Sequence, residues 1–473
     1  MGYSSEGWFR NQFGFLRRQF LQDGELPFTN VLCEDTVAPA LDAIEFAWKD
    51  RIYTPLVTLW VFLGQVLSAD HSCRAAVARL LAHRVARGDS VCSAETGAYC
   101  QARKRLPEKF FSSVVRNVGR KLEDQVQENW LWKGHHVYMF DGTTTLMPDT
   151  PENQEAYPQT CKQKSGAGMP LARVAAIISL SCGVVLDLGF AKYAGKNQGE
   201  VSLLHKLLGI FSAGDVLLAD CLMCNWRVLF SFKDRGVNVV TRLNKAHRKA
   251  DFRRGKRLGK EDHIVRWKKP TSIRSVDWPT YHTFPDSIVV REARVYIKQP
   301  GFRTRSIVVV TTLLDPVQYP KEELALLYRA RWHNELDLRS IKTVMQMECL
   351  RCKTPELVRK EIWTHVLAYN LIRTIMAQGA SRYELHPRTI SFKGTLQTLE
   401  AFQPMLAIRG EGNRLFRRRL YEQLLEAVVT HRVGGRPNRI EPRRIKRRHK
   451  HYVPLSVPRA EAKRQILKGL AKN

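Results

Sequence analysis

Apolar residues in the first part of the chain recur at intervals of three and four positions. The segments Phe62–Asp70, Cys73–His83 and Glu108–Val115 all show this spacing, which is typical of amphipathic helices. The longest apolar run, Pro55–Leu67, is too short for the roughly 20 residues that span a bilayer. We therefore expect a buried helix there and a helical N-terminal domain at residues 1–125.

The pattern changes between about residues 126 and 378, where short apolar runs come first and then alternate with helical segments. Strands are predicted near 136–141, 171–180, 184–193, a run that ends at Asp220, and 237–243, and helices near 201–211 and 225–235. This order predicts an α/β domain with a mixed sheet, because crossover helices join parallel strands. In such a sheet Asp141 and Asp220, which each end a buried strand, can lie side by side.

The charge of the chain predicts a polyanionic partner. Its 473 residues include 76 Lys and Arg against 45 Asp and Glu, which gives a net charge of +31 and a pI near 10.0. Anionic membranes would attract the same charge, but no segment is predicted to cross a bilayer, and Met1–Glu6 has no apolar signal core. We therefore expect a cytoplasmic protein without a membrane partner.

A short stretch, residues 328–342, carries a tyrosine, a carboxylate and cations at helical spacing. At about 100° per residue, Tyr328, Arg331 and Lys342 fall within about 40° of Glu335 on a continuous helix. A carboxylate can hold a hard divalent cation that polarises a phosphodiester, while neighbouring cations bind the flanking phosphates. This stretch therefore predicts the chemistry of cutting and joining nucleic acid.

The spacing of these four residues resembles the signature of DDE transposases of the insertion-sequence-four family of bacterial mobile elements. Asp141 and Asp220 would complete a catalytic triad with Glu335. The resemblance implies an RNase H-like core and two Mg²⁺ ions held by the triad, with Mn²⁺ as a possible substitute. It also implies cleavage at element ends and joining of the 3′-hydroxyl to target DNA. The expected protein is a nucleoid-associated bacterial transposase that binds double-stranded DNA as a homodimer.

The long gap between Asp220 and Glu335 predicts a β-rich insertion at about 245–310. It opens with the basic run Lys245–Lys260 and continues with alternating, strand-like segments. Related enzymes can stack an aromatic side chain of such an insertion on a displaced nucleotide. Trp267 and Trp278 are the candidates by residue type, with ordinary packing as the alternative for each.

Two further basic segments could contact DNA. Ser93–Leu106 begins with a possible helix cap and ends in three cations, so it could be a recognition helix or a surface helix with a solvated end. The C-terminal region, residues 379–473, contains a dense cationic stretch at 431–452 that is suited to a phosphate backbone. A solvated tail is the alternative there. Glu200 is interpreted as a surface group or as a residue behind the site.

Two Cys-x-x-Cys pairs, Cys221–Cys224 and Cys349–Cys352, raise the alternative of a structural zinc site. The pairs are far apart in the sequence and would have to converge in the fold. We expect reduced, buried thiols and no structural disulfides among the ten cysteines.

Three other functions stay open on the sequence. The first is a structure-selective nuclease with the same core, which the long insertion and the basic flanks argue against. The second is a catalytically silent DNA-binding protein derived from a transposase, which the intact carboxylates argue against. The third is a zinc-dependent interaction protein, which would require the two cysteine pairs to meet.

Overall fold

Two compact units make up the computed structural model of this protein, which describes residues 6–22, 26–44, 48, 51–86, 88–273, 276–296, 306–409, 414–433 and 456–470. The helical unit comprises Met1–Gly134, Ser181–Asp187 and Leu336–Gly434. The sheet unit comprises His135–Leu180, Leu188–Glu335 and Gly435–Asn473. These units do not follow the boundaries predicted at 125 and 378, because much of the chain after Glu335 packs with the N-terminal helices.

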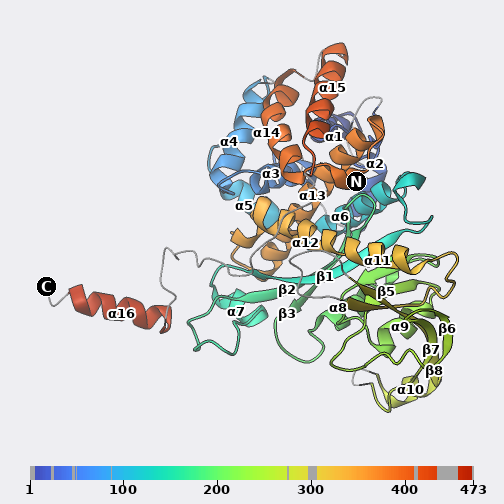
Figure 1. The fold of residues 1–473 in the computed structure, drawn as a ribbon. Coiled ribbons are helices and arrows are strands. Elements are labelled where there is room, and N and C mark those ends of the chain that lie inside the picture. The colour runs from blue at the N-terminus through green and yellow to red at the C-terminus, as the bar shows by residue number, and fades with distance from the viewer. Residues whose placement is uncertain are drawn as a thin grey trace. The chain divides into compact units, whose positions relative to one another are not determined.

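A mixed sheet, nine strands wide in the described part of the chain, forms the core of the sheet unit (Figure 1). The strand order is β3-β2-β1-β4-β5-β9-β8-β7-β6. β1 is antiparallel to β2 and parallel to β4, and β4 is parallel to β5. The predicted mixed α/β architecture is therefore confirmed. The strands are β1 Val137–Leu146, β2 Leu171–Ser179, β3 Val185–Lys192, β4 Val216–Ala219, β5 Asn238–Arg242, β6 Lys256–Gly259, β7 Asp262–Lys268, β8 Ser287–Tyr296 and β9 Ser306–Thr311.

The central strands β1 and β4 are apolar because both of their faces are covered. All four residues of β4 and the first four of β1 are buried, which is the pattern of parallel strands inside an α/β sheet. Their parallel register sets Phe140 opposite Ala219. Asp141 follows Phe140 and Asp220 follows Ala219, so the sheet brings the two carboxylates close together.

The predicted insertion between 245 and 310 is β-rich and extends the central sheet. β9 pairs antiparallel with β5, and β8, β7 and β6 follow outward as antiparallel neighbours. A short helix, α10 (Trp278–Thr283), lies between β7 and β8 in the sequence. The insertion is therefore continuous with the strands that carry the carboxylates.

Helices cover both sides of the sheet. α8 (Glu200–Lys206) and α9 (Trp226–Lys233) lie on one side, and α11 (Lys321–Ala330) lies on the other (Figure 1). α8 packs against β1 and β2, whereas α11 packs against β5, β8 and β9. The sheet unit also contains α7 (Pro151–Ala156) and α16 (Arg459–Leu470).

The helical unit is built around α13 (Pro355–Arg382), which is buried along most of its length. It packs against α3, α6 and α15. The predicted buried helix at Pro55–Leu67 is confirmed as α3 (Pro55–Val66), and the Thr54 side chain caps it by accepting from the Val57 amide. The other main helices are α1 Glu6–Gln19, α2 Glu34–Asp42, α4 Cys73–Ala86, α5 Gly97–Arg105, α6 Glu108–Glu123, α14 Phe392–Arg409 and α15 Arg414–Thr430.

Among the helices of the described residues, none has both the length and the apolar character that a membrane-spanning helix requires. The ten cysteines, all of which lie in the described part of the chain, are free thiols. Of the cationic stretch predicted at 431–452, only residues 431–433 lie within the described residues.

Candidate active site

Asp141 and Asp220 are held by backbone contacts where β1 and β4 run side by side. The amide of Gly142 donates to Asp141 Oδ1 at 2.8 Å, and the amide of Leu222 donates to Asp220 Oδ1 at 2.8 Å. The Thr241 hydroxyl, from neighbouring β5, donates to the Asp220 carbonyl at 2.6 Å. These bonds restrict both carboxylates, as a preorganised site requires.

The two carboxylates are close enough to influence each other electrostatically. The pKa of Asp141 is raised to about 6, mainly because the group is buried, and the charges of Asp220 and Glu200 raise it further. The hydrogen bond from Gly142 and the charge of Arg331 act in the opposite direction. Burial and the two neighbouring carboxylates thus outweigh the opposing effects of the Gly142 amide and Arg331 on the pKa of Asp141.

Glu335 reaches the same site through Arg331. Arg331 lies between α11 and α12 (Trp332–Arg339), and its Nη2 is 3.0 Å from Glu335 Oε1. The Nη1 of the same guanidinium is 3.7 Å from Asp141 Oδ2. Within the sheet unit, Asp141 and Asp220 are neighbours because they follow the paired residues Phe140 and Ala219. Arg331 connects Asp141 to Glu335 through its two ion pairs.

The prediction of one continuous helix from Tyr328 to Lys342 is wrong. α11 ends at Ala330, α12 follows Arg331, and the chain changes to a π-helix at Ser340–Val344. Arg331 itself keeps right-handed helical torsions, φ −49° and ψ −29°, so its contact with Glu335 four residues later is preserved. Lys342 lies in the π-helix and belongs to the helical unit, so its role at the site stays a prediction.

Tyr328 lies within electrostatic reach of the site. Its pKa is raised, first by burial and then by the charges of Asp220 and Cys221, while Arg331 and Arg242 oppose this shift. The phenol therefore stays protonated near neutral pH and can donate a hydrogen bond. It lies near both guanidinium groups, which suits a contact with a phosphate or a sugar.

The sequence did not identify Arg242 and Cys221 as parts of this site. Arg242 is the last residue of β5, and its Nη2 donates to Cys221 Sγ at 3.3 Å. The position of Arg242 at the end of a predicted strand could have identified it, because ligands of α/β sheets bind beyond the carboxyl ends of the strands. Arg242 ends β5, which is parallel to β4. Arg242 adds a second guanidinium beside Asp220 and Tyr328.

The carboxylates fit a divalent metal by their chemistry. Oxygen ligands are those that Mg²⁺ and Mn²⁺ prefer, and Asp141 and Asp220 supply carboxylate oxygens at neighbouring strand ends. No three His, Cys, Asp or Glu side chains of the described residues are already grouped to hold an ion. Arg331 lies between Asp141 and Glu335, so a metal would have to replace one of its ion pairs.

Cys221 and Cys224 belong to the sheet unit, whereas Cys349 and Cys352 belong to the helical unit, so a zinc site shared by the two pairs stays an untested alternative. Cys221 is occupied by its hydrogen bond with Arg242, and burial raises the pKa of Cys224 to about 12. Cys349 is exposed and Cys352 is buried. The expectation of buried thiols therefore holds for Cys224 and Cys352, is met in part by Cys221 and is wrong for Cys349.

The two candidate tryptophans of the insertion differ in exposure. Trp267 is 4% exposed, its Nε1–H donates to Glu292 Oε1 at 2.8 Å, and the Arg248 guanidinium lies 4.3 Å from its ring centre. This burial favours the packing role for Trp267 over nucleotide stacking. Trp278 is 69% exposed and contacts the rings of Tyr281 and His282, and its stacking on a nucleotide stays a prediction.

The segment predicted as a possible recognition helix is α5, which begins at Gly97 rather than next to Ser93. Of its three terminal cations, Arg103 is buried and donates to Gln65 Oε1 at 3.1 Å. Lys104 and Arg105 are exposed. One of the three cations therefore stabilises the helical unit, and DNA recognition by α5 stays a prediction.

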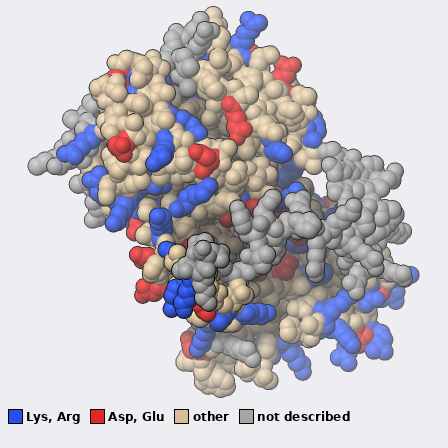
Figure 2. All heavy atoms as spheres, turned by 90° about the vertical axis from the view of Figure 1, so that its left-hand side faces the viewer, with Lys and Arg blue, Asp and Glu red and all other residues tan. Residues whose placement is uncertain are grey.

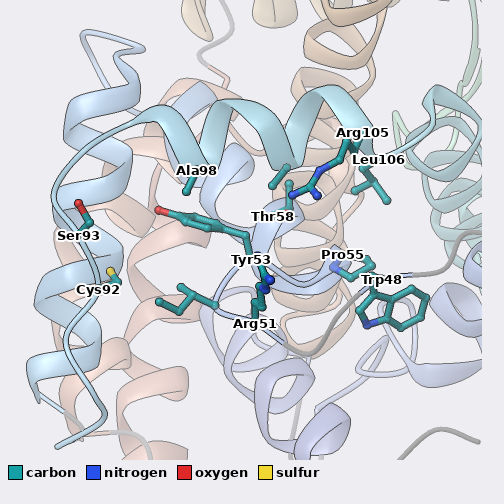
Figure 3. A pocket seen from close by; sticks show the side chains of 12 residues that line it. Trp48, Arg51, Tyr53, Pro55, Thr58, Cys92, Ser93, Ala98, Arg105 and Leu106 are labelled. Carbon is teal, nitrogen blue, oxygen red and sulfur yellow. The ribbon is translucent and has the colours of Figure 1, made fainter.

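A cavity of ≈ 740 Å³ lies beside α5 in the helical unit (Figure 3). Tyr53, Trp48 and Arg105 are among the side chains that line it, and burial raises the pKa of Tyr53 to about 12. The described residues that line the cavity include no carboxylate, so they offer no ligands for a hard divalent cation. The cavity is therefore separate from the chemistry of Asp141, Asp220 and Glu335.

Comparison with known proteins gives a family match over the part of the chain that carries these carboxylates. Residues 132–371 match the family model described as "Transposase DDE domain". The chain is 28% identical over 322 residues to the transposase InsG for insertion sequence element IS4 of Escherichia coli K12, which covers 65% of this chain and 69% of that protein. It is also 36% identical over 69 residues to the transposase for insertion sequence element IS421 of Escherichia coli, covering 15% and 19% of the two chains. Among solved structures, the piggyBac transposase synaptic complex with hairpin DNA aligns with a TM-score of 0.42 and 10% identity, over 88% of this chain and 86% of that one.

Proposed function

This chain belongs to the DDE transposase family, and from that premise we propose that it cuts DNA at the ends of an insertion sequence and joins them to target DNA. The observation that carries the proposal is the arrangement of three carboxylates in the sheet unit. Asp141 and Asp220 follow paired positions of parallel strands, and Arg331 joins Asp141 to Glu335. This arrangement supports a site for phosphoryl transfer.

Asp141, Asp220 and Glu335 are the residues that would hold two Mg²⁺ ions, or Mn²⁺ in their place. When bound, the ions supply Lewis-acid polarisation of the phosphodiester and stabilise charge on the attacking and leaving oxygens. The carboxylates set the position of this charge because their strands and hydrogen bonds restrict them. The ion pairs of Arg331 keep the carboxylates partly neutralised before the cations bind.

The cationic and phenolic side chains would hold the DNA backbone. Arg331 and Arg242 can donate to phosphate oxygens, and a guanidinium suits two oxygens at once. The protonated Tyr328 hydroxyl can donate to a phosphate or contact a sugar. Lys342 would add a further charge for the phosphate next to the scissile bond. Trp278 is exposed enough to stack on a displaced base.

The reaction has two phosphoryl transfers. In the first, a water oxygen bonds to phosphorus, the bond to the 3′-oxygen breaks, and that oxygen leaves as the 3′-hydroxyl of the element end. In the second, this hydroxyl bonds to a phosphorus of target DNA and displaces the target's own 3′-oxygen. Each transfer replaces one P–O bond by another, so no external energy source is needed. No enzyme side chain becomes covalently attached, and Tyr328 is not a nucleophile.

The partner in this proposal is double-stranded DNA, both as element ends and as target. The net charge of +31 and the Lys and Arg side chains spread over the face drawn in Figure 2 support such binding. The order β3-β2-β1-β4-β5 supports an RNase H-like core. We further propose a homodimer in the DNA complex, because two element ends must be brought together, and association with the bacterial nucleoid.

A strand-transfer assay tests the proposal. Purified protein would be incubated with DNA carrying the terminal sequences that flank its coding region, Mg²⁺ and a supercoiled plasmid. We expect nicking or cutting at the element ends followed by covalent joining to the plasmid. Cleavage without joined products would identify a nuclease instead, and binding without cleavage would identify a catalytically silent DNA-binding protein.

A further inference from the structure

Glu200 forms an ion pair directly beneath the strand that carries Asp141. It is the first residue of α8, and its Oε1 lies 2.8 Å from Nη1 of Arg173 on β2. The two side chains are only 19% and 21% exposed. α8 packs against β1 and β2, so this ion pair belongs to the contact between a helix and the sheet.

The carboxyl group of Glu200 occupies the space in which a side chain at position 142 would have to fit. A Cβ added to Gly142 would lie 2.5 Å from Glu200 Oε1, 2.6 Å from its Cδ and 2.7 Å from its Cγ. Such distances are far below van der Waals contact, so a side chain at position 142 would force Glu200 out of its place and away from Arg173. Glu200 therefore packs on the backbone of the residue that follows Asp141.

At Asp141 and Gly142, the two faces of β1 contact different groups of side chains. Adjacent residues of a strand point to opposite faces, so the side chain of Asp141 faces away from the side on which Glu200 packs. The register supports this, because Thr144, two residues after Gly142, is opposite Arg173. Arg331 and Glu335 are the partners on the Asp141 side, and Glu200 with Arg173 supports the strand from behind.

We propose that Glu200 is a positioning residue for Asp141, and that Arg173 holds Glu200 in place. This inference rests on the proposed function, because it assigns Asp141 to metal binding. By fixing the Gly142 backbone, Glu200 fixes the amide that donates to Asp141 Oδ1 and so the orientation of that carboxylate. Its negative charge also raises the attraction of the site for a cation, without Glu200 being a ligand. Groups behind a metal ligand commonly have this effect.

The test measures Mn²⁺ binding to the full-length protein in complex with DNA, by electron paramagnetic resonance of the free ion, together with thermal unfolding. Glu200→Ala removes both packing and charge, and we expect Mn²⁺ affinity to fall on the order of tenfold. Glu200→Gln keeps the shape and loses the charge, so we expect a smaller fall. Glu155→Gln, on exposed α7, is the matched control and should bind Mn²⁺ like the wild type.

A double variant separates positioning from general stabilisation. Gly142→Ala alone forces its Cβ against Glu200 and should weaken Mn²⁺ binding. Combining it with Glu200→Ala removes the collision, so the double variant should lose less Mn²⁺ affinity than the two single losses added together. Additive losses in the double variant would overturn the proposal. So would Mn²⁺ affinities of both Glu200 variants equal to that of Glu155→Gln.

Asp141→Asn distinguishes this proposal from the one on which it rests. If Asp141→Asn abolishes Mn²⁺ binding while the Glu200 variants bind like the control, only the positioning role is overturned. If Asp141→Asn binds Mn²⁺ as the wild type does, Asp141 is not a metal ligand. Both proposals are then overturned.

Discussion

Glu335 and Asp337 are two residues apart in the sequence and lie in opposite environments. The Glu335 side chain is 41% exposed, and its arginine partner, Arg331, also faces Asp141. The Asp337 side chain is 1% exposed and is paired with both Arg373 and Arg388. In one region the guanidinium of Arg331 is shared by two carboxylates, and in the other two guanidinium groups pair with one carboxylate.

This difference separates a functional region from a structural one. A buried carboxylate with two arginines has its charge fully compensated, and breaking such a group leaves uncompensated charge in the interior. Arg331 is shared between Asp141 and Glu335, and the pKa of Asp141 is raised to about 6, mainly by burial and further by the charges of Asp220 and Glu200. The carboxylate of Asp337 therefore fits a structural role in the helical unit, and those of Asp141 and Glu335 fit the proposed role in cation binding.

The largest expected effects come from removing the negative charge of Glu335 or of Asp337. Glu335→Gln should lower DNA cleavage by about 10³-fold or more, because a ligand that acts on the transition state is lost, with little change in stability. Asp337→Asn should lower the free energy of unfolding by about 3 to 5 kcal/mol, because Arg373 and Arg388 would be left buried without the charge of their carboxylate partner. Cleavage assays and denaturant unfolding of both variants check this. A stable, active Asp337→Asn variant would contradict the comparison.

A smaller effect is expected for Arg331→Ala. Removing the guanidinium breaks its ion pairs with Asp141 and Glu335, so the affinity for Mn²⁺ should be unchanged or higher. Cleavage should nevertheless fall by about 10²-fold, because a phosphate contact that stabilises developing charge is lost. Arg235→Ala, at an exposed position after α9, is the control. Weaker Mn²⁺ binding in Arg331→Ala would show that Arg331 supports the carboxylates rather than competing with the metal.

The smallest effect is expected within the β-rich insertion, where an exposed and a buried tryptophan can be compared. Trp278→Ala should weaken binding to DNA with an unpaired base by about 1 to 3 kcal/mol and leave stability unchanged. Trp267→Ala should destabilise the fold by about 3 to 5 kcal/mol, because its ring is buried. Fluorescence anisotropy with paired and unpaired DNA and thermal unfolding check both variants. Binding of Trp278→Ala to DNA with an unpaired base as tightly as the wild type binds it would remove Trp278 from the site.

The sequence predicted those parts of the molecule that depend on local pattern. Buried strands appear as continuous apolar runs, so β1 and β4, and with them the neighbouring positions of Asp141 and Asp220, followed from the chain. The buried helix α3 followed in the same way. The contact of Arg331 with Glu335 followed from their helical spacing.

Other features depend on contacts between distant segments, which the pattern does not contain. The break at Arg331 and the π-helix at Ser340–Val344 interrupt a stretch whose composition is helical throughout. Arg103 was read as a surface cation, although it is buried against Gln65. Glu200 lies far from Gly142 in the sequence, and only the packing of α8 on β1 brings them together. In each case tertiary contacts decide the role of a residue whose type allows several.

The central claim, that Asp141, Asp220 and Glu335 bind metal together, is tested most directly by anomalous diffraction from Mn²⁺ in crystals of the protein bound to its element-end DNA. The account predicts anomalous peaks in contact with carboxylate oxygens of all three residues, with the ion pair between Arg331 and Glu335 or Asp141 broken. Peaks at the cysteine pairs instead, or peaks that do not contact all three carboxylates, would contradict it.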